Sequence, residues 1–312
     1  MIIKYNIPIY DICWLNHAKG GVIGTFYEPE SIDELKNICI SLFKEEKRFD
    51  LIGHTSNIYF LPNYNVETMV STRKCRSVEE LSDLIVCDCG LPVATLSRHM
   101  IEKGIRGFEG LIDLPGTVGA AVYGNASCYG CSINALVESF EFLNSYGETV
   151  VHKVDDLKLS KRSSALKRGE MKGVILRIKL RKENGDVQLL KKLVEENHQN
   201  RIVTQPGPKD NLGSIYATGG GWAIYSYIPR AISKVYELLV RLFGRGEIET
   251  QKQKIKILLT ILGKKELVPY VFNWNRYIWK DEQSHRLFWK FHKLHQKMFK
   301  QSIFEIEIKG RV

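Results

Sequence analysis

The fold of this chain is decided by a glycine-rich stretch that reads LPGTVGAA at residues 114–121 and continues as GNA at 124–126 and YG at 129–130. Seven glycines lie between Gly104 and Gly130, more than a packed helix or a central strand accommodates. Glycines let backbone amides approach a ligand closely, and successive amides form a concavity that binds anions. The stretch therefore predicts a shaped backbone that binds a dinucleotide, although a tight loop without a ligand has the same glycine pattern.

Local signals before this stretch predict alternating helices and strands. SIDE at 31–34 is a capping box, and the apolar spacing after it predicts a helix to about Lys47. DLIG at 50–53 and IYFL at 58–61 are short apolar runs that predict two strands, and HTSN at 54–57 has the residue types of a turn between them.

The remaining elements follow from the same signals. We expect a short helix capped by 77–80, a strand over 84–89, a helix over 92–103, a hairpin from 140–143 and 149–152, a strand over 174–180, helices over 187–199, 231–243 and 282–300, and a strand over 304–308. His285, His292 and His295 fall on the helix predicted over 282–300. A metal site needs spacings nearer four on one helix, so these histidines are predicted to form a packing face.

Composition excludes several classes of protein. With 312 residues, 44% hydrophobic and 26% charged, the chain reads as globular, and its length predicts two domains. The net charge of +10 lies wholly in residues 214–312, which hold 18 basic and 8 acidic residues against 27 of each in 1–213. This asymmetry favours either an anionic partner or a solvated basic face.

Features of the termini and cysteines predict a cytoplasmic protein. The N-terminus lacks the pattern of a signal peptide, and no apolar run reaches 18 residues. The seven cysteines are an odd number, which fits reduced thiols better than a disulfide framework. Cys128 and Cys131 form a CxxC pair, but no second pair of cysteines stands at the spacing of zinc ligands, so we expect no metal site.

Several separated motifs together resemble the UDP-N-acetylenolpyruvoylglucosamine reductase family, flavoenzymes of peptidoglycan precursor synthesis. GHTSN at 53–57 is similar to the family's turn beside the flavin, and the run from 107 to 130 is similar to its long flavin-binding stretch. Arg162 resembles the arginine of the family's tyrosine–arginine pair, with Lys161 in place of the tyrosine. The segment from Arg201 to Ser214 resembles the approach to the catalytic serine.

The resemblance implies an α+β protein: a two-subdomain FAD-binding fold of the PCMH/vanillyl-alcohol-oxidase type over 1–213, with a smaller, divergent substrate lobe over 214–312. It implies non-covalent FAD, NADPH as the hydride donor, a nucleotide-sugar substrate, and Arg162, Ser214 and Glu307 as catalytic residues. Glu305 competes with Glu307, and the family spacing favours Glu307. The implied cofactor-binding residues are Gly53, His54, Thr55, Ser56, Asn57, Pro115, Gly116, Thr117, Gly119, Ala120, Asn125, Ala126, Tyr129 and Gly130.

Two departures keep other functions open. After GSIY at 213–216 the family has Lys-Asn-Pro, whereas this chain has ATG, and residues 222–281 resemble nothing in the family. A flavoenzyme for a different nucleotide-linked or surface-polysaccharide sugar is therefore one alternative. The basic C-terminal third supports a second, a non-catalytic anion or nucleic-acid binder on the same fold, although no nucleic-acid module is recognisable. Its basic helices also permit weak peripheral contact with acidic membranes, without insertion.

Overall fold

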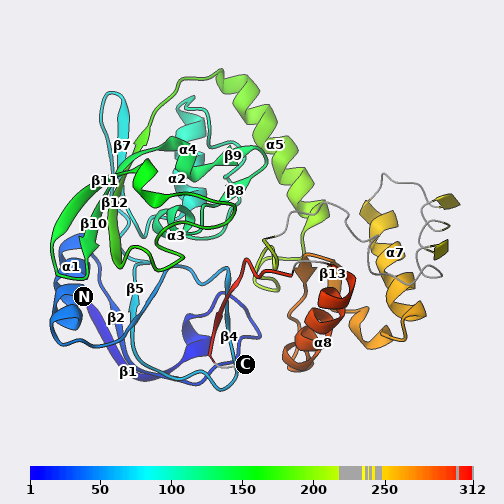
Figure 1. The fold of residues 1–312 in the computed structure, drawn as a ribbon. Coiled ribbons are helices and arrows are strands. Elements are labelled where there is room, and N and C mark those ends of the chain that lie inside the picture. The colour runs from blue at the N-terminus through cyan, green and yellow to red at the C-terminus, as the bar shows by residue number, and fades with distance from the viewer. Residues whose placement is uncertain (218–233, 236–237, 239–240, 243–247, 300–301, 311–312) are drawn as a thin grey trace.

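The chain forms two sheets with helices packed on them, followed by a helical C-terminal lobe, as the computed structural model shows (Figure 1). The structure describes residues 1–217, 234–235, 238, 241–242, 248–299 and 302–310. The fold is of the α+β class expected. Most of the helix expected over 231–243 lies outside the described residues.

The first sheet carries the N-terminal subdomain. Its strands are β1 (Ile2–Pro8), β2 (Val22–Glu28), β5 (Val66–Ser71) and β3 (Asp50–Ile52), in that spatial order. β1 pairs antiparallel with β2, whereas β2, β5 and β3 are parallel. The crossover from β2 to β3 is α1 (Ile32–Lys44), which begins at the predicted cap, where the Ser31 hydroxyl accepts from the Glu34 amide.

The second sheet is antiparallel, and the glycine-rich stretch lies between two of its strands, β7 and β10. Its order is β11 (Thr149–Lys153), β10 (Val137–Asn144), β12 (Gly173–Arg181), β7 (Leu84–Asp88) and β6 (Val78–Glu80). Four helices accompany it: α2 (Val93–Glu102), α3 (Val118–Tyr123), the single turn α4 (Ile133–Leu136) and α5 (Val187–Thr204). One hydrophobic core joins this sheet with α1, α2 and α3.

Two sequence predictions were wrong here. Residues 78–80 form strand β6 and do not begin a short helix, because they pair with β7 along the sheet edge. The glycine-rich stretch is not wholly irregular, because α3 forms inside it and includes Gly119. Glycine is needed at this position of the helix because an added side chain would collide with Cys89. The other expected helices and strands that the structure describes are present, with ends that differ by a few residues.

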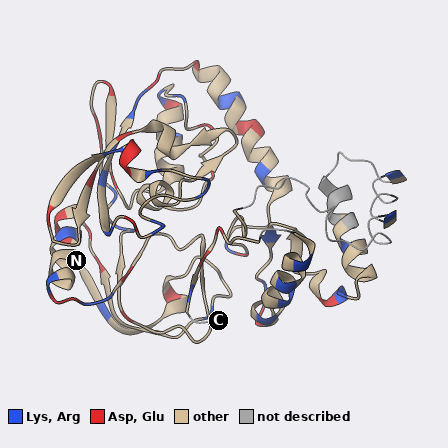
Figure 2. Cartoon of the chain, in the orientation of Figure 1, with Lys and Arg blue, Asp and Glu red and all other residues tan. Residues whose placement is uncertain are grey.

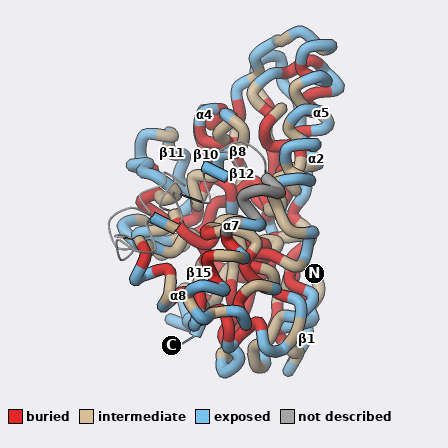
Figure 3. The backbone as a smooth tube through the Cα atoms, turned by 90° about the vertical axis from the view of Figure 1, so that its right-hand side faces the viewer, coloured by how far each residue is buried: buried red, intermediate tan, exposed pale blue. Residues whose placement is uncertain are grey.

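The C-terminal lobe has its own aromatic core. It contains α7 (Ile248–Ile261), the hairpin β13 (Val271–Asn273) and β14 (Arg276–Tyr277), and α8 (Gln283–Met298). This core also takes in Leu15, Tyr59 and Leu61 from the N-terminal subdomain, so the lobe packs directly on it. Figure 3 shows this buried backbone, in red, continuing from the lobe towards β15 (Glu307–Lys309). Within the described residues, no helix combines the length and apolar character needed to cross a membrane.

One face of α8 is basic and the other is packed. Arg286, Lys290, Lys293 and Lys297 are exposed, and the helix contains no acidic residue (Figure 2). His285, His292 and His295 are buried on the opposite face, where their rings stack on Tyr59, Tyr216 and Phe299. Burial lowers the pKa of His295 to about 3, which keeps it neutral in this core. No cluster of three potential metal ligands occurs among the described residues.

The chain's last strand returns to the N-terminal subdomain. β15 pairs in parallel with β4 (Ile58–Phe60), and Figure 1 shows the red C-terminal segment running back from α8 to lie beside it. Asn57, just before β4, holds the junction: its side-chain amide donates to Leu212 O at 2.6 Å and its backbone oxygen accepts from the Glu307 amide at 2.9 Å. One residue therefore links the turn after β3, the entry to the lobe and the final strand.

We expect Asn57→Asp to lower the free energy of unfolding by about 1–3 kcal/mol, because a carboxylate would replace the amide donor and face carbonyl oxygens. Thermal or denaturant unfolding measures the effect. Asn63→Asp makes the same chemical change at an exposed position and is the control. Equal stability of the two variants would contradict the role given to the Asn57 amide.

Candidate active site

The turn at 53–57 is held open by specific contacts and not by glycine alone. Thr55 has a left-handed backbone (φ +57°), and its hydroxyl accepts from the Trp14 amide at 2.7 Å. The Ser56 hydroxyl donates to Pro115 O at 3.0 Å, which binds the first turn to the second glycine-rich turn at 115–117. A side chain at Gly53 would lie 2.6 Å from Thr117 Oγ1, so the two turns approach each other as closely as backbone allows.

Thr117 begins helix α3 as its N-cap. The amides of Val118 and Gly119 donate to Leu91 O and Cys89 O, and the Ala120 amide donates to the Thr117 hydroxyl. These amides are therefore engaged within the protein, which leaves the turn before the helix to face a ligand. Gly119 is required for a reason the sequence did not reveal: an added Cβ would lie 2.8 Å from Cys89 Cβ and 3.0 Å from Cys89 O.

The third part of the candidate cofactor site is the hairpin of β8 (Ser127–Cys128) and β9 (Cys131–Ser132), which Tyr129 and Gly130 connect. The Arg201 guanidinium lies over the Tyr129 ring, 5.9 Å from its centroid. Ahead of the hairpin, the Asn125 side chain donates to Ser160 O at 2.8 Å and also accepts from Asn134. The expected residues from 125 to 130 thus lie beside the loop that carries Arg162.

Strained backbone gathers at these positions. Eight non-glycine residues of the described structure have positive φ: Asn6, Glu46, Thr55, Asn125, Tyr129, Lys158, Arg162 and Lys209. Four of the eight are expected site residues, namely Thr55, Asn125, Tyr129 and Arg162. Each such conformation costs about 1–3 kcal/mol and persists only where the surroundings enforce it, which is typical of functional sites.

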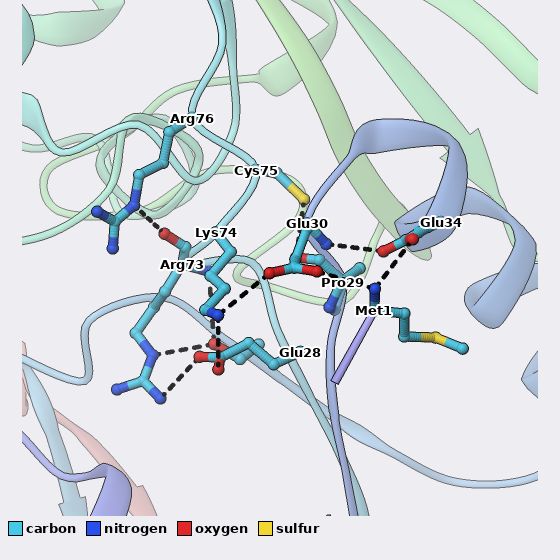
Figure 4. A network of polar contacts seen from close by, with 10 residues as sticks. Met1, Glu28, Pro29, Glu30, Glu34, Arg73, Lys74, Cys75 and Arg76 are labelled. Carbon is cyan, nitrogen blue, oxygen red and sulfur yellow. Dashed lines mark hydrogen bonds and ion pairs between the residues drawn. The ribbon is translucent and has the colours of Figure 1, made fainter. Parts of the chain in front are cut away.

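His54 is uncharged near neutral pH. Burial, followed by the charges of Arg73 and Arg76, lowers its pKa to about 4. Figure 4 shows how the loop bearing these arginines is fixed: Arg73 donates to Glu28, Lys74 to Glu30, and the Arg76 side chain to Arg73 O. The turn at 53–57 therefore contains a neutral imidazole close to the charges of Arg73 and Arg76.

The first and second turns and the β8–β9 hairpin fit the flavin dinucleotide expected from the sequence. They offer backbone amides and hydroxyls, the donor chemistry that a diphosphate binds, and Arg201 lies over the Tyr129 ring of the hairpin. Gly116 and Gly130 have positive φ, and no atom lies within 3.4 Å of a Cβ built on either, so the backbone there is open to a ligand.

The catalytic candidates come from three distant segments. Arg162 Nε lies 3.3 Å from Glu305 Oε1, and both side chains are mostly buried. Lys167 reaches the same residue through Glu305 O at 3.1 Å. Burial raises the pKa of Glu305, against the opposing effect of Arg162 and Arg276.

Glu307, the carboxylate favoured by family spacing, lies elsewhere. Its backbone pairs with β4 and Asn57, and its side chain lies near Tyr123, whose pKa rises through burial and then through Glu307. The structure therefore brings Glu305, and not Glu307, to Arg162. Strand alternation over 304–308 would point both carboxylates to the same face, but β15 begins only at Glu307, and Glu305 lies in the bend before it.

Ser214 meets a residue that the sequence did not single out. Its hydroxyl oxygen accepts from Arg276 Nη1 at 2.6 Å. Arg276 lies on β14, inside the segment that resembles nothing in the family, so no motif could have identified it. The only sequence signal is a lone arginine within WNRYIW at 274–279, among residues that become buried.

The candidate site is rich in arginine and short of acceptors. Burial lowers the pKa of Arg276; the charge of Glu305 raises it, and the charge of Arg201 lowers it further. Among the described residues, the buried Nε atoms of Arg201 and Arg276 have no hydrogen-bond partner. Buried donors without partners are costly, so the cluster is arranged for an anionic ligand that would satisfy them.

Comparisons with known proteins agree with this geometry. Residues 24–152 match a family described as an FAD binding domain. A UDP-N-acetylenolpyruvoylglucosamine reductase of Alkaliphilus oremlandii is 26% identical over 227 residues, covering 71% of this chain and 73% of that protein. The Chlamydia pneumoniae protein of the same name is 27% identical over 279 residues, covering 83% and 88%.

This chain is a homologue of the UDP-N-acetylenolpyruvoylglucosamine reductases. It carries an FAD-binding domain and is an FAD-dependent oxidoreductase. The crystal structure of the reductase from Thermus caldophilus superposes with a TM-score of 0.68 at 19% identity, covering 99% of this chain and all of that one. The fold of the C-terminal lobe is thus comparable even where the sequences diverge.

We expect Gly119→Val to abolish flavin retention and to destabilise the fold by about 1–3 kcal/mol, because the new side chain would push α3 away from Cys89 and displace the turn at 115–117. Flavin absorbance per protein after purification measures the first effect. Gly124→Ala, where an added Cβ would be 3.3 Å from Ala120 O at ordinary φ, is the control. A fully flavinated Gly119→Val protein would contradict this geometry.

Proposed function

We propose that this protein reduces UDP-N-acetylglucosamine enolpyruvate to UDP-N-acetylmuramate, with FAD as cofactor and NADPH as reductant. The observation that carries the proposal is the pairing of Arg162 with Glu305 and of Arg276 with the Ser214 hydroxyl, together with buried Nε atoms of Arg201 and Arg276 that have no hydrogen-bond partner among the described residues. The names of the homologues supply the substrate, and the FAD binding domain supplies the cofactor.

Cofactor binding falls to the two turns and the hairpin. The residues proposed to hold FAD are those at 53–57, 115–117, 119–120, 125–126 and 129–130, with the open backbone at Gly116 and Gly130 available to the diphosphate. Once NADPH has reduced the bound FAD, the flavin supplies a hydride to the alkene of the enolpyruvyl ether.

Side chains of the protein stabilise the negative charge that develops on the substrate and supply the proton. Arg162 suits the substrate carboxylate, because a guanidinium bonds a carboxylate with two donors and stabilises negative charge that spreads onto it as the alkene is reduced. Glu305 holds Arg162 in place through their ion pair, and burial raises the pKa of the Glu305 carboxyl. Ser214 then gives its proton to the carbon next to the carboxylate, and solvent restores the hydroxyl.

A second candidate keeps the flavin and changes the sugar. ATG at 217–219 stands where the family has Lys-Asn-Pro, and Arg276 provides a guanidinium from the segment over 222–281, in which no family motif is recognisable. Both features concern substrate contacts and not the flavin turns. They favour an altered nucleotide-linked or surface-polysaccharide sugar as the acceptor.

The test is to reduce the purified flavoprotein with NADPH without oxygen and then add UDP-N-acetylglucosamine enolpyruvate. We expect rapid return of the oxidised flavin absorbance together with formation of UDP-N-acetylmuramate. Reduced flavin that ignores this acceptor would contradict the proposed substrate and move the assignment to another sugar. A protein without flavin would contradict both flavoenzyme functions and leave the anion-binding alternative.

A further inference from the structure

Arg276 is one hydrogen bond from the proposed proton donor. Its Nη1 donates to Ser214 Oγ at 2.6 Å and to Asn275 O at 3.1 Å. A contact of 2.6 Å between a guanidinium and a hydroxyl oxygen is at the short end of charge-assisted hydrogen bonds.

The two residues are held on rigidly joined segments. The side chain of Asn275, which precedes Arg276, accepts from the Tyr216 amide at 2.6 Å and donates to Tyr216 O at 3.1 Å. The Ile215 amide donates to Asn275 O at 3.1 Å. Tyr216 and Tyr277 on either side are fully buried. The backbones that bear Arg276 and Ser214 are therefore fixed relative to each other, and the guanidinium is held by its second bond to Asn275 O.

The chemistry of the contact matches the need of a weak acid. A hydroxyl has two acceptor lone pairs and one hydrogen, so an arginine on the oxygen leaves the hydrogen free to be given away. A neighbouring positive charge stabilises the alkoxide that remains after the proton has left. Burial lowers the pKa of Arg276, but a guanidinium stays protonated in proteins, so the charge is present when the proton moves.

We propose that Arg276 is the positioning residue of the reaction: it holds the Ser214 oxygen, aims its hydrogen at the substrate carbon and offsets the charge left on the oxygen. This inference rests on the proposed function, in which Ser214 is the proton donor. It adds a residue from the segment over 222–281, where the chain departs most from the family, and gives that segment a part in the chemistry.

The experiment compares five proteins: the wild type, Arg276→Met, Arg276→Lys, Ser214→Ala and the Arg276→Met/Ser214→Ala double variant. Flavin content and the rate of flavin reduction by NADPH are measured first, and we expect both to be unchanged. The rate of flavin reoxidation by UDP-N-acetylglucosamine enolpyruvate is measured next. We expect Arg276→Met to slow it roughly 100-fold, Arg276→Lys to recover part of that loss, and the double variant to be no slower than Ser214→Ala.

Two outcomes of the kinetic comparison would overturn the proposal. Reoxidation of Arg276→Met at the wild-type rate would show that the contact has no function. A double variant slower than Ser214→Ala by the full factor lost in Arg276→Met would show that Arg276 acts separately from the serine. Arg286→Met, an exposed arginine on α8, is the matched control and is expected to react as the wild type does.

Thermal unfolding of the same proteins separates this proposal from the proposed function. We expect the double variant to lose less melting temperature than the two single losses together, because the singles remove the same contact. If the wild type does not react with the acceptor, the proposed function is wrong, and this comparison still decides whether Arg276 holds Ser214. Fully additive losses would then overturn the positioning role.

Discussion

The ion pair between Arg162 and Glu305 is the interaction on which the candidate active site depends, because it joins a loop of the flavin-binding part to the chain's last segment. The Glu305 carboxylate is mostly buried and pairs with Arg162. Burial raises its pKa, the positive charges of Arg162, Arg276 and Lys167 act to lower it, and Lys167 also donates to Glu305 O. A single acid among several cations leaves positive charge uncompensated in a low-dielectric site. An anionic substrate that enters would complete this charge balance, and the same charge would favour negative charge that develops during the reaction.

The path of the chain explains why the pair can form. β15 must return from the lobe to β4, and Asn57 ties that return both to the flavin turn and to the segment before Ser214. The Asn275 side chain performs a similar function on the lobe side by fixing β14 to Tyr216. Two asparagine amides thus set the separation between the cofactor turns and the lobe residues. Such fixed frameworks are what catalytic groups need in order to hold productive geometry.

Sequence reasoning succeeded where the controlling forces are local. The Ser31 cap and the alternation of β12 each depend on neighbours a few residues away. It failed where packing within the sheet or between segments decides: residues 78–80 form a strand because they pair with β7, which itself pairs with β12, and Gly119 is needed because of Cys89. The choice between Glu305 and Glu307 and the presence of Arg276 at Ser214 likewise depend on contacts across more than 60 residues of chain.

The most direct measurement replaces each of the two candidate carboxylates with its amide and compares reoxidation of the reduced flavin by UDP-N-acetylglucosamine enolpyruvate. Glu305→Gln removes the charge beside Arg162 and the acid group, so we expect a loss of roughly 10²- to 10⁴-fold with flavin retained. Glu307→Gln keeps the β15 pairing, which uses only backbone atoms, and is expected to react within a few-fold of the wild type. The reverse order, a slow Glu307→Gln and an active Glu305→Gln, would contradict the active site described here.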